Sequence, residues 1–163
     1  MTDQSICRTR GNQLKSFNAD GSLRWKKNLK TSIQSSPAVG PDGTVFICTQ
    51  HRKPNAIDPV DGSLKRSGDM EFFGSPRPAV ASDGSVSLTD DQDKIYRFDK
   101  DGALLWKKAS PGKLNGPVSV GRDGTTFAPS EDGKLYAYDR DGNEKWAYEA
   151  GSPLRRAPVE RKV

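Results

Sequence analysis

The sequence predicts an all-β protein, a β-propeller with about four four-stranded sheets, or blades, in one chain of 163 residues. Two features predict this fold. Asp-Gly pairs recur about every 40 residues in two series, and a column of tryptophans keeps step with one of them. In addition, only 33% of the residues are hydrophobic, which favours several small sheets that cover one another over one large core.

The first Asp-Gly series marks the last turn of each repeat. It occupies 20–21, 61–62, 101–102 and 141–142, with spacings of 41, 40 and 40. Asp-Gly between two alternating segments indicates a hairpin, because glycine accepts a positive φ and aspartate bonds the nearby backbone. Five residues after each aspartate stands a tryptophan, except in the second repeat, where Arg66 takes its place. The structural repeat positions are therefore Trp25, Trp106, Trp146, Asp20, Gly21, Asp61, Gly62, Asp101, Gly102, Asp141 and Gly142.

A second Asp-Gly series lies between the first two strands of a repeat, at 42–43, 83–84 and 123–124. A short apolar strand led by a proline precedes the turn, as at 36–40, and a strand with alternating apolar residues follows it. A loop then leads to a third strand, such as 134–139, and the fourth strand carries the tryptophan column. Each repeat therefore predicts four short antiparallel strands.

The repeats predict a single propeller domain over 1–163. The tryptophan column precedes the next strand-leading proline by 12 residues, which predicts a further first strand after Trp146 at Pro158. We expect the partial sheet at 1–30, which lacks a first strand, to be completed by the segment 151–163. The complete sheets are expected over about 31–70, 71–110 and 111–150.

Two segments of the sequence resemble the repeat of the PQQ-like (pyrroloquinoline-quinone-type) β-propellers. They are IYRFDKDGALLWKKAS at 95–110 and LYAYDRDGNEKWAYEA at 135–150. The resemblance implies that Trp25, Trp106 and Trp146 dock between adjacent sheets, and Arg66 departs from this pattern. Such repeats serve quinone dehydrogenases, membrane-assembly scaffolds and sensor domains, so the resemblance implies no single activity.

Two ways of closing the ring fit these repeats. One chain would form a closed four-bladed ring, or two chains would exchange the segment 151–163 and form an eight-bladed ring as a two-fold homodimer. The homodimer is favoured, because propellers with this kind of repeat usually have seven or eight blades, and closure at four needs about twice the rotation per sheet. A third interpretation is that the chain is a piece of a longer propeller.

Neither a prosthetic group nor a metal is predicted. In the quinone dehydrogenases that the repeat resembles, PQQ lies over a tryptophan floor, beneath a disulfide of adjacent cysteines and beside a calcium ion. Here Cys7 and Cys48 are 41 residues apart, and the tryptophans belong to the repeat column. His51 is the single histidine, so a zinc site of the usual ligands is not expected. We therefore predict no catalytic residue, no cofactor, PQQ included, and no metal ligand.

The charged loops are expected to be solvated. Asp90–Asp93 and Glu131–Asp132 are acidic, whereas the matching loop at His51–Lys53 is basic. The aspartates of the turns lack the distal glutamate of a calcium loop and are expected to bond their own turns. Cys7 is expected to be a small core residue, because it falls in one repeat column with Ile47, Leu88 and Ala128.

The chain carries 26 basic and 21 acidic residues, a net charge of +5. Basic residues near the C-terminal end form a candidate patch for an anionic partner, namely Arg155, Arg156, Arg161 and Lys162. The aromatic residues belong to repeat columns and leave no platform on which bases would stack. Nucleic acid is therefore not expected to be the partner.

The sequence favours a non-catalytic propeller that acts as a binding or scaffold module for a protein or a small ligand and that also binds a second copy of itself. Two alternatives stay open: a quinoprotein-type or other enzyme that is active only in the complete ring, and a weak binder of anionic polymers. No apolar run approaches the roughly 18 residues of a membrane span. The N-terminal residues lack the apolar stretch of a signal peptide, so we expect a cytoplasmic protein, or a periplasmic or other extracytoplasmic one if a signal peptide has been removed.

Overall fold

The computed structural model describes residues 4–9, 12–50, 53–71, 77–114, 116–156 and 158. These residues form 15 strands in four antiparallel sheets that follow one another along the chain. The prediction of an all-β fold built from four successive sheets is therefore confirmed. Within these ranges there is no helix with the length and apolar character needed to cross a bilayer.

The first sheet has three strands and the other three sheets have four each. Sheet 1 contains β1 (Gln4–Arg8), β2 (Gln13–Asn18) and β3 (Leu23–Asn28). Sheet 2 contains β4 (Ala38–Val39), β5 (Val45–Thr49), β6 (Lys53–Ile57) and β7 (Leu64–Ser67). Sheet 3 contains β8 (Ala79–Val80), β9 (Val86–Thr89), β10 (Lys94–Phe98) and β11 (Leu104–Ala109). Sheet 4 contains β12 (Ser119–Val120), β13 (Thr126–Pro129), β14 (Lys134–Tyr138) and β15 (Glu144–Glu149).

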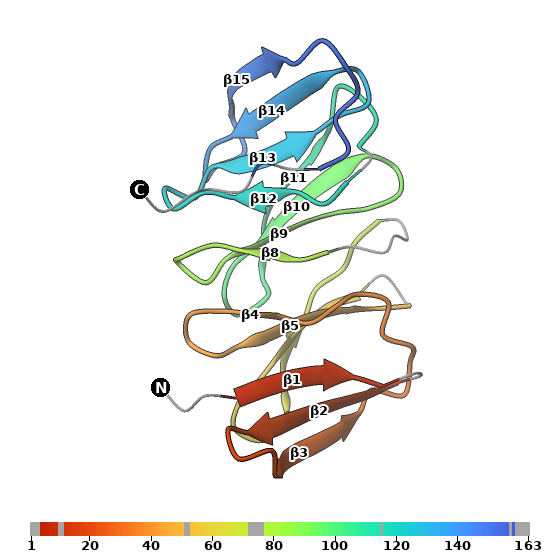
Figure 1. The fold of residues 1–163 in the computed structure, drawn as a ribbon, viewed down its shortest axis with the longest axis vertical. Helices are drawn as coiled ribbons and strands as arrows, with labels where there is room; N and C mark the ends of the chain where they lie inside the picture. Colours follow the sequence, from red (N-terminus) through yellow and green to blue (C-terminus); the bar gives the residue numbers. More distant parts are fainter. Residues whose placement is uncertain are drawn as a thin grey trace.

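The four sheets stack one after another in an open arc, as Figure 1 shows. The short first strands β4, β8 and β12 lie beside one another along this arc. Sheets 1 and 4 lie at opposite ends of it, so the chain does not close a four-bladed ring on itself in this structure. The completion of sheet 1 by the segment 151–163 falls partly outside the described residues and stays a prediction.

The Asp-Gly turns have the geometry that their composition predicts. The glycine of each turn has a positive φ, at Gly21, Gly43, Gly62, Gly84, Gly102, Gly124 and Gly142. An aspartate bonds each turn: Oδ1 of Asp61 accepts a hydrogen bond of 2.8 Å from the backbone N–H of Ser63, whereas in the last turns of sheets 3 and 4 the acceptors are Asp99 and Asp139. The bond from Ser63 lowers the pKa of Asp61. The carboxylates thus shape the turns, as the sequence predicts.

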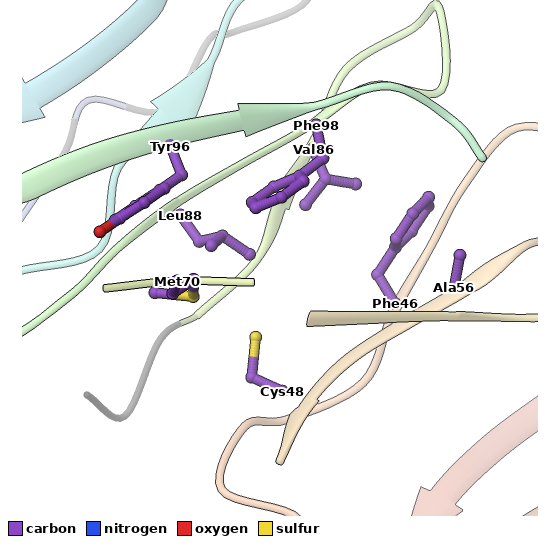
Figure 2. Close-up of a cluster of buried hydrophobic side chains, with 8 residues drawn as sticks. All are labelled: Phe46, Cys48, Ala56, Met70, Val86, Leu88, Tyr96 and Phe98. Atoms are coloured by element: carbon purple, nitrogen blue, oxygen red, sulfur yellow. The ribbon is translucent and has the colours of Figure 1, made fainter. Parts of the chain in front are cut away.

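The hydrophobic core is divided into three layers, one between each pair of adjacent sheets. Figure 2 shows the layer between sheets 2 and 3, where Phe46 and Ala56 lie opposite Val86 and Phe98. The rings of Tyr96 and Phe98 in this layer stack with centroids 6.2 Å apart. Each sheet is therefore buried by its neighbours, which explains how a chain with 33% hydrophobic residues builds a core.

Candidate interaction surface

The indole of Trp25 closes the junction between sheets 1 and 2, and it is 8% exposed. Its Nε1 donates a hydrogen bond of 2.9 Å to the carbonyl of Pro59, in the last turn of sheet 2. The ring lies on Gly62, where a Cβ atom would come within 2.7 Å of Cε3 of the indole. Because no side chain fits in that space, glycine is needed here for the contact as well as for the turn. We call this contact, an indole on the last Asp-Gly turn of the next sheet, the indole dock.

Trp106 makes the same dock between sheets 3 and 4. Its Nε1 donates a hydrogen bond of 2.8 Å to the carbonyl of Arg140, and a Cβ atom at Gly142 would lie 2.9 Å from Cδ2 of the indole. Two positions further along β11, the Lys108 ammonium bonds the carbonyl of Gly142 at 2.9 Å and lies 5.4 Å from the centre of the Tyr138 ring. The outer strand of sheet 3 thus donates two side-chain hydrogen bonds to the last turn of sheet 4.

Arg66 occupies the dock position between sheets 2 and 3. It pairs with Ala56 across the strands, and a Cβ atom at Gly102 would lie 3.4 Å from the Cβ of Arg66. The aliphatic stem of the arginine therefore lies where an indole lies at the other junctions. A void of about 10 Å³, lined in part by Phe46, Ala56, Phe98 and Gly102, remains in this junction. The junction between sheets 2 and 3 therefore has an arginine stem in place of the indole dock.

Trp146 does not lie between two sheets of this chain, although the resemblance implied that it would. Its side chain is on sheet 4 at the free end of the arc and is 44% exposed, and Tyr148 on the same strand is 64% exposed. The indole contacts the ring of Phe127, with centroids 5.8 Å apart. An open hollow of about 540 Å³ lies on this face, lined by Ser119, Val120, Gly121, Phe127, Leu135, Trp146 and Pro158.

Sheet 1 has a free face at the other end of the arc. Cys7 lies there and is exposed, so the expectation of a buried core residue is wrong. The other residues of its column, Ile47, Leu88 and Ala128, are buried because each faces the preceding sheet. No sheet of this chain precedes sheet 1. A Cβ atom at Gly21 would meet nothing within 4 Å. The last turn of sheet 1 is therefore a dock without an indole.

A buried arginine that sequence reasoning missed joins sheets 3 and 4. Arg97 is 1% exposed and donates hydrogen bonds to the carbonyl of Gly124 and, at 2.7 Å, to the hydroxyl of Ser85. Its guanidinium lies 3.5 Å from the carboxylate of Asp83. Burial lowers the pKa of Arg97, against the raising effect of Asp83. The sequence does mark this position, because Arg97 stands at a repeat position that holds small residues such as Ala56 and Ala137 in the other sheets.

The acidic groups at the loop end of sheet 3 are engaged in the fold. The Tyr96 hydroxyl donates a hydrogen bond of 2.8 Å to Asp90, and Oδ1 of Asp93 accepts one of 2.7 Å from the backbone N–H of Leu114. Glu71 pairs with the ammonium groups of Lys107 and Lys94, and these hydrogen bonds lower the pKa of Glu71 to about 2. Asp91 is exposed and faces solvent.

The described residues do not fit the PQQ site of the quinone dehydrogenases. Cys7 on sheet 1 and Cys48 on sheet 2 are both free thiols, and the indoles of Trp25 and Trp106 lie on protein turns. The ranges that the structure describes contain no group of three or more His, Cys, Asp or Glu side chains placed to hold a metal ion. The expectation of no cofactor and no metal stays a prediction.

The candidate anionic patch is described only in part. Arg155 and Arg156 are exposed, and the backbone of Arg155 lies against Gly116, where a Cβ atom would meet its carbonyl oxygen at 2.5 Å. Arg161 and Lys162 lie outside the described residues, as does His51. The structure therefore brings together only the first two members of the patch.

One family model, that of the outer membrane protein assembly factor BamB, matches residues 56–162. No curated protein matches the chain. The crystal structure of BamB from Moraxella catarrhalis superposes with a TM-score of 0.78 at 20% identity, over 91% of this chain and 46% of that one. The structure of BBS1N in complex with ARL6DN, soaked with lead, superposes with a TM-score of 0.69 at 13% identity, over 88% of this chain and 52% of that one.

These likenesses have two consequences. At such low identity the superpositions show the fold alone, and the chain spans about half the length of the solved structures that it matches. The family match covers well over half of the chain and coincides with the repeats from which the resemblance to PQQ-like propellers was drawn. The chain therefore belongs to the PQQ-like propeller family of the outer membrane protein assembly factor BamB.

Proposed function

We propose that this chain is a non-catalytic propeller that serves as a binding or scaffold module for a protein partner. The proposal rests on the observation that polar and aromatic side chains of this chain form structural contacts within the fold. Asp61 bonds its own turn, Trp25 docks on the next sheet and Arg97 joins two sheets. These three side chains are thus engaged in the fold, and we propose the loops as the surface for recognition.

The names of the relatives support a protein as the partner. BamB is an assembly factor for outer membrane proteins, and BBS1N forms a complex with ARL6DN. In this chain the loops between second and third strands carry Asp91 on sheet 3 and Glu131 on sheet 4. Lys53 begins β6 on sheet 2 and pairs with Asp69, and Lys113 lies 3.5 Å from Glu131. We propose that a basic segment of the partner binds over sheets 3 and 4.

We also propose that two copies of the chain complete a ring of eight sheets with two-fold symmetry. The free faces at both ends of the arc support this assembly, since Trp146 and Tyr148 are exposed on sheet 4 and Cys7 is exposed on sheet 1, and large apolar side chains left in water are unfavourable. A closed ring would present the loops of eight sheets as one rim. Light scattering of the purified chain is expected to give twice the chain mass of 17.8 kDa.

The enzyme alternative is tested by absorption spectroscopy. Titration of the whole chain with PQQ and calcium is expected to give no saturable spectral change, and no dehydrogenase turnover with simple alcohols. Saturable binding accompanied by turnover would overturn the non-catalytic proposal and establish the quinoprotein alternative in its place.

Recognition by the loops is tested with two synthetic peptides of equal length, one lysine-rich and one glutamate-rich. We expect the lysine-rich peptide to bind more tightly, and the variant with Asp91→Lys and Glu131→Lys to lose this binding. The matched control is Lys26→Glu on the exposed outer strand β3, which is expected to leave the affinity unchanged. Equal binding of the two peptides, or equal binding by both variants, would contradict the assignment of the surface.

A further inference from the structure

We propose that Trp146 docks on the last turn of sheet 1 in a second copy of this chain, with its ring on Gly21 and its Nε1 donating to the carbonyl of Ala19. This inference rests on the two-copy ring proposed above and names the contact that closes it. The chain itself shows the indole dock at two junctions. It has one further indole and one further turn, and neither has its counterpart in the same chain.

Trp146 has the position of a docking indole. It pairs with Ala137 across the strands, as Trp106 pairs with Arg97 and Trp25 with Ser16. The strand, the register and the preceding Asp-Gly turn are thus the same in all three sheets. The difference lies in exposure, which is 8% for Trp25 and 44% for Trp146. The open hollow beside Trp146 lies where the next sheet lies at the internal junctions.

Gly21 has the position of a receiving turn. Its φ of 83° matches the 73° of Gly62 and the 84° of Gly142. A Cβ atom would meet an indole at 2.7 Å on Gly62 and at 2.9 Å on Gly142, whereas on Gly21 it would meet nothing within 4 Å. The acceptor for Trp106 is the carbonyl two residues before the glycine, which corresponds to Ala19 in this turn.

The surroundings of the two free positions match as well. Phe17 of sheet 1 is in the column of Ile57, Phe98 and Tyr138, which are buried at the internal junctions. Tyr148 takes the place of Lys108, whose ammonium lies over the Tyr138 ring. In the proposed junction Tyr148 therefore lies over Phe17, and two half-exposed aromatic rings cover each other.

We infer that a second copy of this chain covers these faces. The free face of sheet 4 offers the indole of the dock, and the free face of sheet 1 offers the turn that receives an indole. Within one arc Trp146 and Gly21 lie on sheets at opposite ends and do not meet. Two chains related by a two-fold axis satisfy both free indoles and both free turns with identical contacts. The proposed interface thus continues the indole dock of the internal junctions, with Trp146 and Gly21 at the positions of Trp106 and Gly142.

The first test compares single substitutions of the full chain by analytical ultracentrifugation. Trp146→Ala and Gly21→Asn are each expected to raise the dimer dissociation constant by at least about 30-fold, as expected for the loss of a buried aromatic anchor. Asparagine tolerates a positive φ, so Gly21→Asn fills the dock with little strain in the turn. The control is Leu64→Ala on β7 of sheet 2, because this apolar side chain is 50% exposed and belongs to neither end sheet of the arc.

The second test uses the two thiols as reporters. Cys7 lies on the free face of sheet 1 and is exposed in the single chain, whereas Cys48 is buried in the layer between sheets 2 and 3. With an aromatic disulfide reagent, we expect Cys7 to react slowly in the concentrated wild type and faster on dilution. In Trp146→Ala it should react fast at every concentration, and Cys48 should react only on unfolding in both proteins.

The outcomes separate this inference from the ring on which it rests. A wild-type dimer that Trp146→Ala and Gly21→Asn leave equally tight, with Cys7 reactive, would overturn the dock and leave the two-copy ring standing. A wild type that stays at 17.8 kDa at high concentration would overturn both. A mass well above two chains would overturn the two-copy ring and the role of the dock in closing it, because head-to-tail docking would then form a filament that does not close.

Discussion

The indole of Trp25 donates a hydrogen bond of 2.9 Å to the carbonyl of Pro59 and thereby joins the outer strand of sheet 1 to the last turn of sheet 2. Because this indole is also buried, Trp25→Ala is expected to lower the free energy of unfolding by about 3–5 kcal/mol. The loss for Trp146→Ala should be about 1 kcal/mol, since its indole is 44% exposed in the single chain.

Urea unfolding at low protein concentration, where single chains predominate, measures both losses. Trp106→Ala should fall between the two variants, because its indole makes the dock but keeps part of its surface in solvent. Equal losses for Trp25→Ala and Trp146→Ala would contradict the view that docking, and not the tryptophan itself, provides the stability.

Arg66→Trp is expected to stabilise the chain by about 1 kcal/mol, through apolar area buried against Gly102. The new indole would lie on Gly102, as the indoles of Trp25 and Trp106 lie on Gly62 and Gly142. Arg66→Ala is the control and should destabilise, because it removes the aliphatic stem that now covers the turn. The thermal midpoints of the three proteins test this, and a lower midpoint for Arg66→Trp would show that the junction cannot accept the indole of the repeat.

Binding of nucleic acid is expected to be weak, indifferent to sequence and lost at moderate salt. The candidate basic patch consists of four cationic side chains, of which the structure describes Arg155 and Arg156, both exposed, and binding that rests on so small a patch is weak and screened by added salt. A gel shift with two unrelated duplexes at two salt concentrations measures this. A complex that survives high salt, or that forms with one duplex only, would establish the anionic-polymer alternative.

Acid is expected to destabilise the fold through the turn aspartates. The backbone N–H and hydroxyl of Thr125 and the ammonium of Lys145 lower the pKa of Asp123 from 3.8 to about 2. Because the folded-state pKa is the lower one, this carboxylate stabilises the fold above about pH 4, and the contribution is lost as the pH falls toward 2. The thermal midpoint should therefore drop across this window, and Asp123→Asn should show a shallower drop.

The control for this pH dependence is Asp91→Asn, which removes an exposed loop carboxylate from sheet 3. We expect it to reproduce the wild-type profile between pH 5 and 2. If Asp123→Asn and Asp91→Asn gave the same profile as the wild type, the loss of stability in acid would come from other carboxylates, Glu71 among them, whose pKa is also about 2.

The order of the sheets and the turns was predictable because their signals are local: an Asp-Gly pair shapes its own turn wherever the sheet lies. The exposure of Cys7 and Trp146 was not predictable, because both occupy repeat positions that lie between two sheets elsewhere in the chain. They are exposed only because their sheets lie at the ends of the arc. The pairing of Glu71 with Lys94 and Lys107 was also not predictable from the sequence, because it joins residues far apart along the chain. Arg97 escaped for a further reason: long charged side chains are rarely buried, so it was not considered for the core.

The buried position of Arg97 makes it the most informative single substitution between sheets 3 and 4. Arg97→Met keeps the length of the side chain but removes the donors to the carbonyl of Gly124 and the hydroxyl of Ser85, and it leaves Asp83 without the guanidinium 3.5 Å away. We expect a loss of about 2–4 kcal/mol in urea unfolding, in the range of broken buried pairs and unsatisfied buried groups. Arg156→Met, at an exposed side chain on the C-terminal segment, is the control and should change stability by less than about 0.5 kcal/mol. A neutral Arg97→Met would mean that a methionine packs between the sheets as well as the bonded guanidinium does, and that the arginine is dispensable for the junction.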